Sequence, residues 1–141
     1  MMIYIVEDDK NIQEIESFAL KNSGYEVRGF EYAKDFYAAL DEQIPDLVLL
    51  DIMLPGKDGF ELLGVMKEHG IPVIYITAKA DVNSKIKGLR SGAEDYIVKP
   101  FEVLELLVRV EKVLERTGKQ KEIIQVKDLE IHLSETGRQS V

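Results

Sequence analysis

Five residues of this sequence have side chains that could take part in chemistry, and each follows or ends a short apolar run. The carboxylates Glu7 and Asp8 come after the first run, and Asp51 comes directly after the third. The hydroxyl of Thr77 ends the fourth run, and the ammonium of Lys99 follows the fifth. Because strand-to-helix loops of a doubly wound sheet all emerge at the carboxyl ends of its strands, we expect these side chains to converge.

Three crowded carboxylates repel one another and take up protons unless a cation neutralises them. A bound divalent cation keeps them ionised near neutral pH, and Mg²⁺, which prefers hard oxygen ligands, fits best. One carboxylate is then free to attack phosphorus and form an aspartyl phosphate. We assign this role to Asp51, with the ammonium of Lys99 neutralising phosphoryl oxygens and the hydroxyl of Thr77 donating a hydrogen bond.

Each of these residues also has an ordinary structural explanation when it is considered alone. Glu7 and Asp8 are then a solvated turn or a helix N-cap, and Asp51 is a turn former ahead of a Pro-Gly pair. Thr77 is a β-favouring residue near a strand end, and Lys99 is a surface ammonium. Complementary chemistry at four separate strand ends favours a site over these separate explanations.

The hydrophobic pattern predicts five strand-helix units, which form a doubly wound five-stranded parallel sheet of the α/β class. Apolar runs without alternation, such as Leu47–Leu50, indicate strands that are covered on both faces. The predicted strands cover residues 2–6, 25–30, 47–50, 72–77 and 95–98, and the predicted helices cover about residues 12–24, 33–43, 59–69, 81–92 and 103–117.

Composition narrows the classes of function. The 141 residues carry a formal charge of −8 and contain no cysteine, and 45% of them are hydrophobic, which suits one compact domain with a tail. The acidic balance argues against nonspecific binding to nucleic-acid phosphates. The missing cysteines exclude disulfides, thiolate metal sites and a cysteine nucleophile. Since no apolar run approaches a membrane span, we expect a soluble cytoplasmic protein that does not engage a membrane.

A change of pattern marks the end of the chain. Residues 118–123 are polar and begin with glycine, which is typical of a linker. Apolar and polar residues then alternate from Ile124 to Leu133, which predicts the opening of an antiparallel β unit. A lone hairpin is at best marginally stable. Either this tail packs on the first domain or the chain is cut before a second domain is complete.

The motifs around the five residues resemble the receiver domain of bacterial two-component response regulators over residues 1–117. These motifs are Ile5–Asp9, Leu49–Gly56, Ile76–Lys79 and Gly92–Phe101. The resemblance implies a flavodoxin-like fold in which Asp51 accepts a phosphoryl group from a sensor histidine kinase. It implies a switch whose chemistry is limited to its own aspartate, and not an enzyme that acts on outside substrates.

The resemblance also implies a role for each site residue. The ligands of Mg²⁺ would be Glu7, Asp8, Asp51 and the backbone carbonyl of Met53. Thr77 and Lys99 would contact the phosphoryl group, and Thr77 and Tyr96 would form a coupled switch. The peptide bond between Lys99 and Pro100 would be cis.

The stretch from Tyr96 to Phe101 and the helix after it resemble the OmpR/PhoB-type subfamily. Its members dimerise on phosphorylation through the fourth helix, fifth strand and fifth helix. The residues expected to form ion pairs across that face are Lys85, Asp95, Glu105, Arg109 and Arg116. The alternative explanation is that these residues are exposed surface charges, whose ion pairs each contribute only about 0–1 kcal/mol to stability. Residues 124–141 resemble the first strands of a truncated winged-helix effector domain. DNA binding would then require the rest of that effector domain.

Three other functions fit the sequence less well. An aspartate-nucleophile Mg²⁺ phosphatase uses a second aspartate two residues after the nucleophile, where this chain has Met53. A flavodoxin needs a hydroxyl- and glycine-rich phosphate loop after the first strand, where this chain has Glu7-Asp8-Asp9, whose charge repels phosphate. A receiver-type interaction domain that works without phosphorylation is disfavoured by the retained acidic, Thr and Lys positions.

Overall fold

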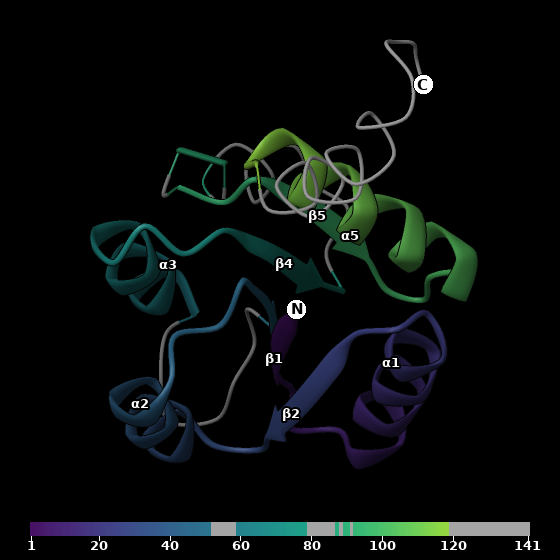
Figure 1. The fold of residues 1–141 in the computed structure, drawn as a ribbon, viewed down its shortest axis with the longest axis horizontal. Helices are drawn as coiled ribbons and strands as arrows, with labels where there is room; N and C mark the ends of the chain where they lie inside the picture. Colours follow the sequence, from purple (N-terminus) through teal and green to yellow (C-terminus); the bar gives the residue numbers. More distant parts are fainter. Residues whose placement is uncertain (52–58, 79–86, 88, 91, 119–141) are drawn as a thin grey trace, which may run out of the picture.

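The computed structural model describes residues 1–51, 59–78, 87, 89–90 and 92–118 (Figure 1). Within these ranges, no helix combines the length and apolar character needed to cross a bilayer. Several predicted features lie outside the described residues and are not tested by the structure. The predicted helix over residues 81–92 lies largely outside the described residues, as do Met53, Lys85, the β tail and all of the predicted linker except Gly118.

The described chain forms a five-stranded parallel sheet in the order β2-β1-β3-β4-β5, which confirms the predicted fold class. Its strands are β1 (Met2–Val6), β2 (Glu26–Phe30), β3 (Leu47–Asp51), β4 (Val73–Thr77) and β5 (Asp95–Val98). The helices around it are α1 (Lys10–Asn22), α2 (Ala33–Glu42), α3 (Gly59–Glu68) and α5 (Val103–Arg116). The winding direction reverses between β1 and β3, which is where ligands collect in open α/β sheets.

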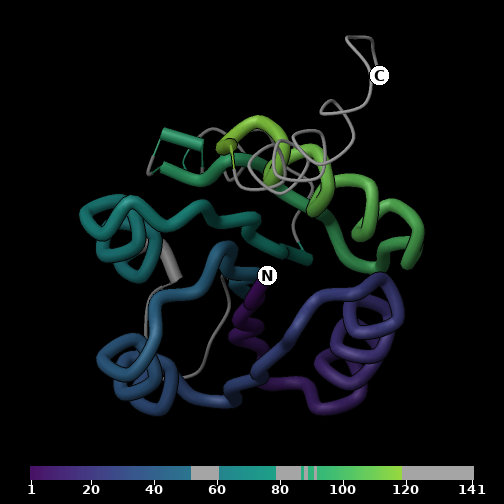
Figure 2. Tube along the Cα trace, viewed as in Figure 1, coloured from purple at the N-terminus to yellow at the C-terminus, as the bar shows by residue number. Residues whose placement is uncertain are grey.

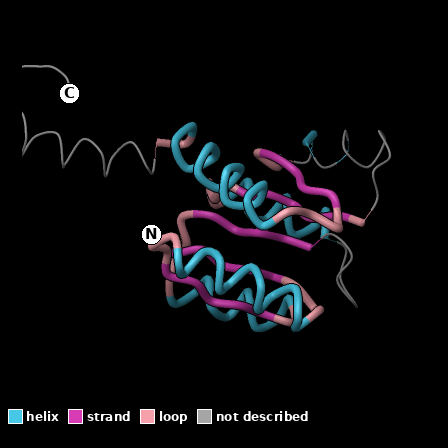
Figure 3. Tube along the Cα trace, turned by 90° about the vertical axis from the view of Figure 1, so that its right-hand side faces the viewer, coloured by secondary structure: helices cyan, strands magenta, loops and turns pink. Residues whose placement is uncertain are grey.

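Helices cover both faces of the sheet. Helices α1 and α5 lie on one face, and α2 and α3 lie on the other (Figures 1 and 2). In Figure 3 the side of the molecule that carries α1 and α5 faces the viewer, and the strands run across the picture with the amino terminus on the left. Every residue of β3 and β4 is buried, which explains why these strands are almost continuously apolar.

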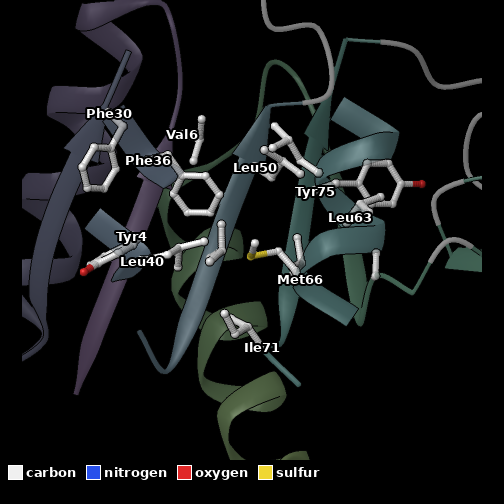
Figure 4. Packing of buried hydrophobic residues seen from close by; sticks show 14 of the residues in the cluster. Tyr4, Val6, Phe30, Phe36, Leu40, Leu50, Leu63, Met66, Ile71 and Tyr75 are labelled. Carbon is white, nitrogen blue, oxygen red and sulfur yellow. The ribbon is translucent and has the colours of Figure 1, made fainter. Parts of the chain in front are cut away.

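Alternate residues of each strand feed two separate cores, because successive side chains of a strand point to opposite faces. Tyr4 and Leu50 belong to the core under α2 and α3, whereas Ile5 and Leu49 belong to the core under α1 and α5. The first core is rich in aromatic side chains (Figure 4). Tyr4, Phe30 and Phe36 meet edge to face there, with ring centroids 5.1–6.2 Å apart.

Two local details set the geometry of the sheet's carboxyl edge. Strand β3 is one residue longer than predicted, because Asp51 continues the ladder opposite Ile76 of β4. Helix α1 begins at Lys10 because the side chain of Asp9 accepts hydrogen bonds from the amides of Asn11 (2.9 Å) and Ile12 (3.2 Å). The chain therefore turns sharply between β1 and α1, which leaves Glu7 and Asp8 at the strand end.

Candidate functional site

The predicted site residues lie at the ends of four strands. Glu7 follows β1 and Lys99 follows β5, while Asp51 and Thr77 are the last residues of β3 and β4. Two backbone hydrogen bonds extend the ladder past the strands, from Glu7 N to Phe30 O (2.9 Å) and from Lys99 N to Thr77 O (2.8 Å). Because the strands are parallel and in register, these ends meet at one edge.

One ammonium joins two buried carboxylates at this edge. Lys99 Nζ lies 3.0 Å from Glu7 Oε1 and 3.1 Å from Asp51 Oδ2. Glu7 is 1% exposed and Asp51 is 3% exposed, while the Lys99 side chain keeps 20% of its surface exposed. The positions of these three residues at strand ends predict that they lie together, but the ion pairs between them appear only in the structure.

The surroundings shift two pKa values in this group. Burial, followed by the hydrogen bond and charge of Asp51, raises the pKa of Glu7 from 4.5 to about 7, although the Asp9 backbone amide and Lys99 act in the opposite direction. Burial lowers the pKa of Lys99, but the hydrogen bonds and charges of Glu7 and Asp51 outweigh burial, and the pKa is raised above its ordinary value. Glu7 is therefore the carboxyl group of this edge that exchanges its proton near neutral pH.

The chemistry of the donors fits a hard divalent cation. Glu7, Asp8 and Asp51 each place a carboxylate oxygen within 4.8 Å of the others. Three carboxylates share only one ammonium here, so the described site keeps an excess of negative charge. Oxygen ligands of this kind are those that Mg²⁺ prefers. The fourth predicted ligand, the carbonyl of Met53, lies outside the described residues.

The residues predicted to contact and report a phosphoryl group lie on β4 and β5. Thr77 is 2% exposed and pairs in register with Val98. Tyr96 lies two positions earlier on β5, with its ring 5.8 Å from the ring of Tyr75. The peptide bond between Lys99 and Pro100 is cis.

Two polar residues of α1 that the sequence analysis did not single out lie near the site. Gln13 Nε2 donates a hydrogen bond to the backbone carbonyl of Glu7 at 3.0 Å and so braces the turn after β1. Glu16 is completely buried. Its position, four residues after Ile12 and four before Leu20, is a sequence signal that could have revealed a carboxyl group on the apolar face.

The charges expected on the dimer face are paired within one chain. Both carboxylate oxygens of Asp95 accept hydrogen bonds from Arg109 Nη1 at 3.0 Å, and Glu105 accepts one from Arg109 Nε at 3.1 Å. Arg116 pairs with Glu94, at 3.4 Å. Lys85 lies outside the described residues. Strand β5 and helix α5 thus form a continuous charged surface.

Comparisons with known proteins agree with this geometry. The sequence profile of the response regulator receiver domain matches residues 3–111. The phosphate regulon transcriptional regulatory protein PhoB of Pseudomonas aeruginosa is 44% identical over 120 residues, covering 82% of this chain and 52% of PhoB. Response regulator DrrB of Thermotoga maritima, an OmpR/PhoB homologue, is 40% identical with a TM-score of 0.75, covering 82% of this chain and 52% of DrrB.

A further solved structure, a CheY-like receiver domain protein from Methanospirillum hungatei, is 32% identical with a TM-score of 0.77. That match covers 84% of this chain and 97% of the other. The present chain spans about half the length of PhoB and of DrrB. The matched profile, the identity to PhoB and the shared fold show that this chain belongs to the response regulator receiver domain family and is related to its OmpR/PhoB-type members.

Proposed function

We propose that Asp51 is the phosphoacceptor of this receiver domain and takes its phosphoryl group from a phosphohistidine of a sensor kinase. A carboxylate oxygen of Asp51 attacks phosphorus, the phosphorus–nitrogen bond breaks, and the imidazole leaves and takes up a proton. The observation that carries this proposal is the position of Asp51, at the sheet's carboxyl edge with Lys99 Nζ 3.1 Å from its Oδ2.

The neighbouring side chains supply the electrostatics of the transfer. The ammonium of Lys99 would move from the carboxylates toward the incoming phosphoryl oxygens, where it offsets their charge. Thr77, on the next strand, would donate a hydrogen bond to the same group. Glu7, Asp8 and Asp51, with the carbonyl of Met53, would hold Mg²⁺, which when bound screens the charge between the phosphoryl group and the carboxylates.

Phosphoryl uptake from a small donor tests the proposal. We expect the chain to gain the mass of one phosphoryl group when it is incubated with acetyl phosphate and Mg²⁺, because the site itself carries the groups that the transfer needs. Chelation of Mg²⁺ with EDTA should reduce the gain strongly, as it leaves the carboxylates to repel the donor. Intact-mass spectrometry measures both samples, and the absence of any gain with Mg²⁺ would rule out the proposal.

Phosphorylation of Asp51 would also shift the balance between two conformations of the surface formed by β5 and α5. Asp51 phosphorylation would redirect Lys99 and Thr77, and Tyr96 would report the change, since its ring lies near both the ring of Tyr75 and the guanidinium of Arg109. A charge change at the site would in this way alter the surface of β5 and α5.

We propose that this surface is the dimer interface of the phosphorylated chain. It bears an open groove of about 600 Å³ lined by residues of β5 and α5, including Leu104 and Val108. Leu104 is 71% exposed and Val108 is 44% exposed, so the groove offers apolar contact within a charged rim. Arg109 forms ion pairs with Asp95 and Glu105 there. In the dimer these three side chains would pair with charges of the second copy.

Removal of the central arginine should weaken that dimer. We expect Arg109→Ala to raise the dissociation constant of the phosphorylated dimer about fivefold to tenfold, because Asp95 and Glu105 lose their shared partner at the interface. Analytical ultracentrifugation with acetyl phosphate and Mg²⁺ measures the constant. Arg28→Ala is the matched control, since Arg28 lies on β2 at the opposite edge of the sheet. Equal dimerisation of all three chains would contradict the proposed interface.

The longer proteins to which this chain is similar suggest an output. PhoB is a transcriptional regulatory protein, and we propose that this receiver controls transcription in a cytoplasmic full-length protein. DNA would be contacted only through an effector domain, whose first strands residues 124–141 resemble.

A further inference from the structure

Glu16 is an acidic residue in an apolar setting. Its side chain is 0% exposed, and neither carboxylate oxygen has a hydrogen-bond partner among the described residues. It lies on the inner face of α1, one helical turn before Leu20, whose side chain is part of the core under α1 and α5. A carboxyl group buried in this position without a partner costs free energy, and the cost is much larger when the group is ionised than when it is protonated.

The charges that act on Glu16 come from the candidate site. Glu7 after β1, Asp51 at the end of β3 and Lys99 after β5 all contribute to its electrostatics. Helix α5, which contacts α1, buries only apolar side chains, those of Leu106, Val110, Val113 and Leu114. Arg28 of β2 lies toward the other face, over the rings of Tyr4 and Phe30.

Glu16 does not belong to the cation cluster itself. The group of carboxylate oxygens that lie within 4.8 Å of one another consists of Glu7, Asp8 and Asp51 among the described residues. Glu16 makes no hydrogen bond to any of them. Its influence therefore has to act through the protein interior, where a low dielectric lets charges interact more strongly than in water.

We propose that Glu16 is a buried positioning residue of the phosphoacceptor site, which exchanges a proton as a divalent cation binds to Glu7, Asp8 and Asp51. With the proton in place, Glu16 adds no charge to an already acidic edge. When a cation arrives, its positive charge favours the ionised carboxylate behind it, and the proton leaves to solvent. The inference rests on the proposed cation site but assigns a role to a residue outside it.

The electrostatics of Glu16 agree with this role. Burial, followed by the negative charge of Glu7, raises the pKa of Glu16 from 4.5 to about 8, while Lys99 acts in the opposite direction. Cation binding would lower the pKa of Glu16 and, by reciprocity, ionisation of Glu16 would raise the cation affinity by the same factor. Each pKa unit of coupling corresponds to about tenfold in affinity.

The test compares Mg²⁺ affinity at two pH values in the parent chain, Glu16→Gln and Glu14→Gln. Glu14 is an exposed acid on the same helix, so Glu14→Gln removes an equal formal charge without touching the interior. At pH 6 we expect all three chains to bind Mg²⁺ about equally, since Glu16 is then protonated. At pH 9 we expect Glu16→Gln to bind about tenfold more weakly than the parent chain and Glu14→Gln.

Isothermal titration calorimetry in buffers of different ionisation enthalpy adds a second readout. Near pH 7.5 the parent chain should release more protons per Mg²⁺ than Glu16→Gln. Glu16→Leu, which fills the site with an apolar side chain, should behave like Glu16→Gln. A purely structural role of Glu16 would not move proton release.

The outcomes separate this inference from the proposed function. If the parent chain accepts phosphoryl groups but matches Glu16→Gln in Mg²⁺ affinity at both pH values, the inference about Glu16 is wrong and the proposed function stands. If Mg²⁺ affinity depends on Glu16 as described but no chain accepts a phosphoryl group, the inference holds and the proposed function fails.

Discussion

A chain carrying Asp51→Asn is expected to take up no phosphoryl group from acetyl phosphate in the presence of Mg²⁺. An amide oxygen is not a nucleophile toward phosphorus at neutral pH, and Asp51 is the carboxylate that ends β3, with Lys99 Nζ 3.1 Å from its Oδ2. The substitution should also lower the pKa of Glu7, because a hydrogen bond and a negative charge from Asp51 help to raise it. Intact-mass spectrometry measures the first effect, and NMR titration of the Glu7 carboxyl carbon measures the second.

Asp41→Asn is the control for this prediction, because Asp41 is an exposed aspartate of α2. It should accept a phosphoryl group as the parent chain does. Equal mass gain in Asp51→Asn and the parent chain would show that another residue is the acceptor. An unchanged Glu7 titration would instead show that the charges of Glu7 and Asp51 are not coupled.

Replacement of Glu16 with leucine should stabilise the fold by about 2–4 kcal/mol at pH 8, since it removes a buried acid without hydrogen-bond partners. The sign follows from the pKa, which burial raises from 4.5 to about 8 in the folded chain. Between these values the unfolded chain has released the proton and the folded chain retains it, so Glu16 lessens stability progressively as pH rises. The gain on substitution should therefore be small near pH 4.5 and largest at pH 8 and above.

Urea denaturation at pH 5, 6.5 and 8 measures this gain. Glu14→Leu serves as the control, because a change at an exposed helix position should alter the free energy of unfolding by roughly 0.5 kcal/mol or less. A gain in Glu16→Leu that does not grow with pH would show that Glu16 is ionised in the folded chain throughout this range. A loss of stability would show that its carboxyl group makes favourable interactions.

The fold class and the residues of the acidic edge could be predicted from sequence patterns. Apolar runs of strand length and apolar residues at helical spacing are local signals. They predict strands and helices correctly because the faces that they mark become buried in the fold. Glu7, Asp51, Thr77 and Lys99 could be predicted as neighbours because the end of a parallel strand has a fixed place in a doubly wound sheet. For the described strands and helices, the predicted boundaries lie within a few residues of those in the structure. Asp51 is the last residue of β3 and not the first residue after it.

The pairing and the charge of these groups depend on the folded arrangement and could not be predicted from sequence patterns. That Lys99 joins Glu7 and Asp51, that Gln13 braces the turn after β1, and that Arg109 pairs with Asp95 depend on side-chain reach across elements. Glu16 illustrates the reason most clearly. Its chemistry follows from burial and from charges on three other segments, and neither quantity is a property of residues that are adjacent in sequence.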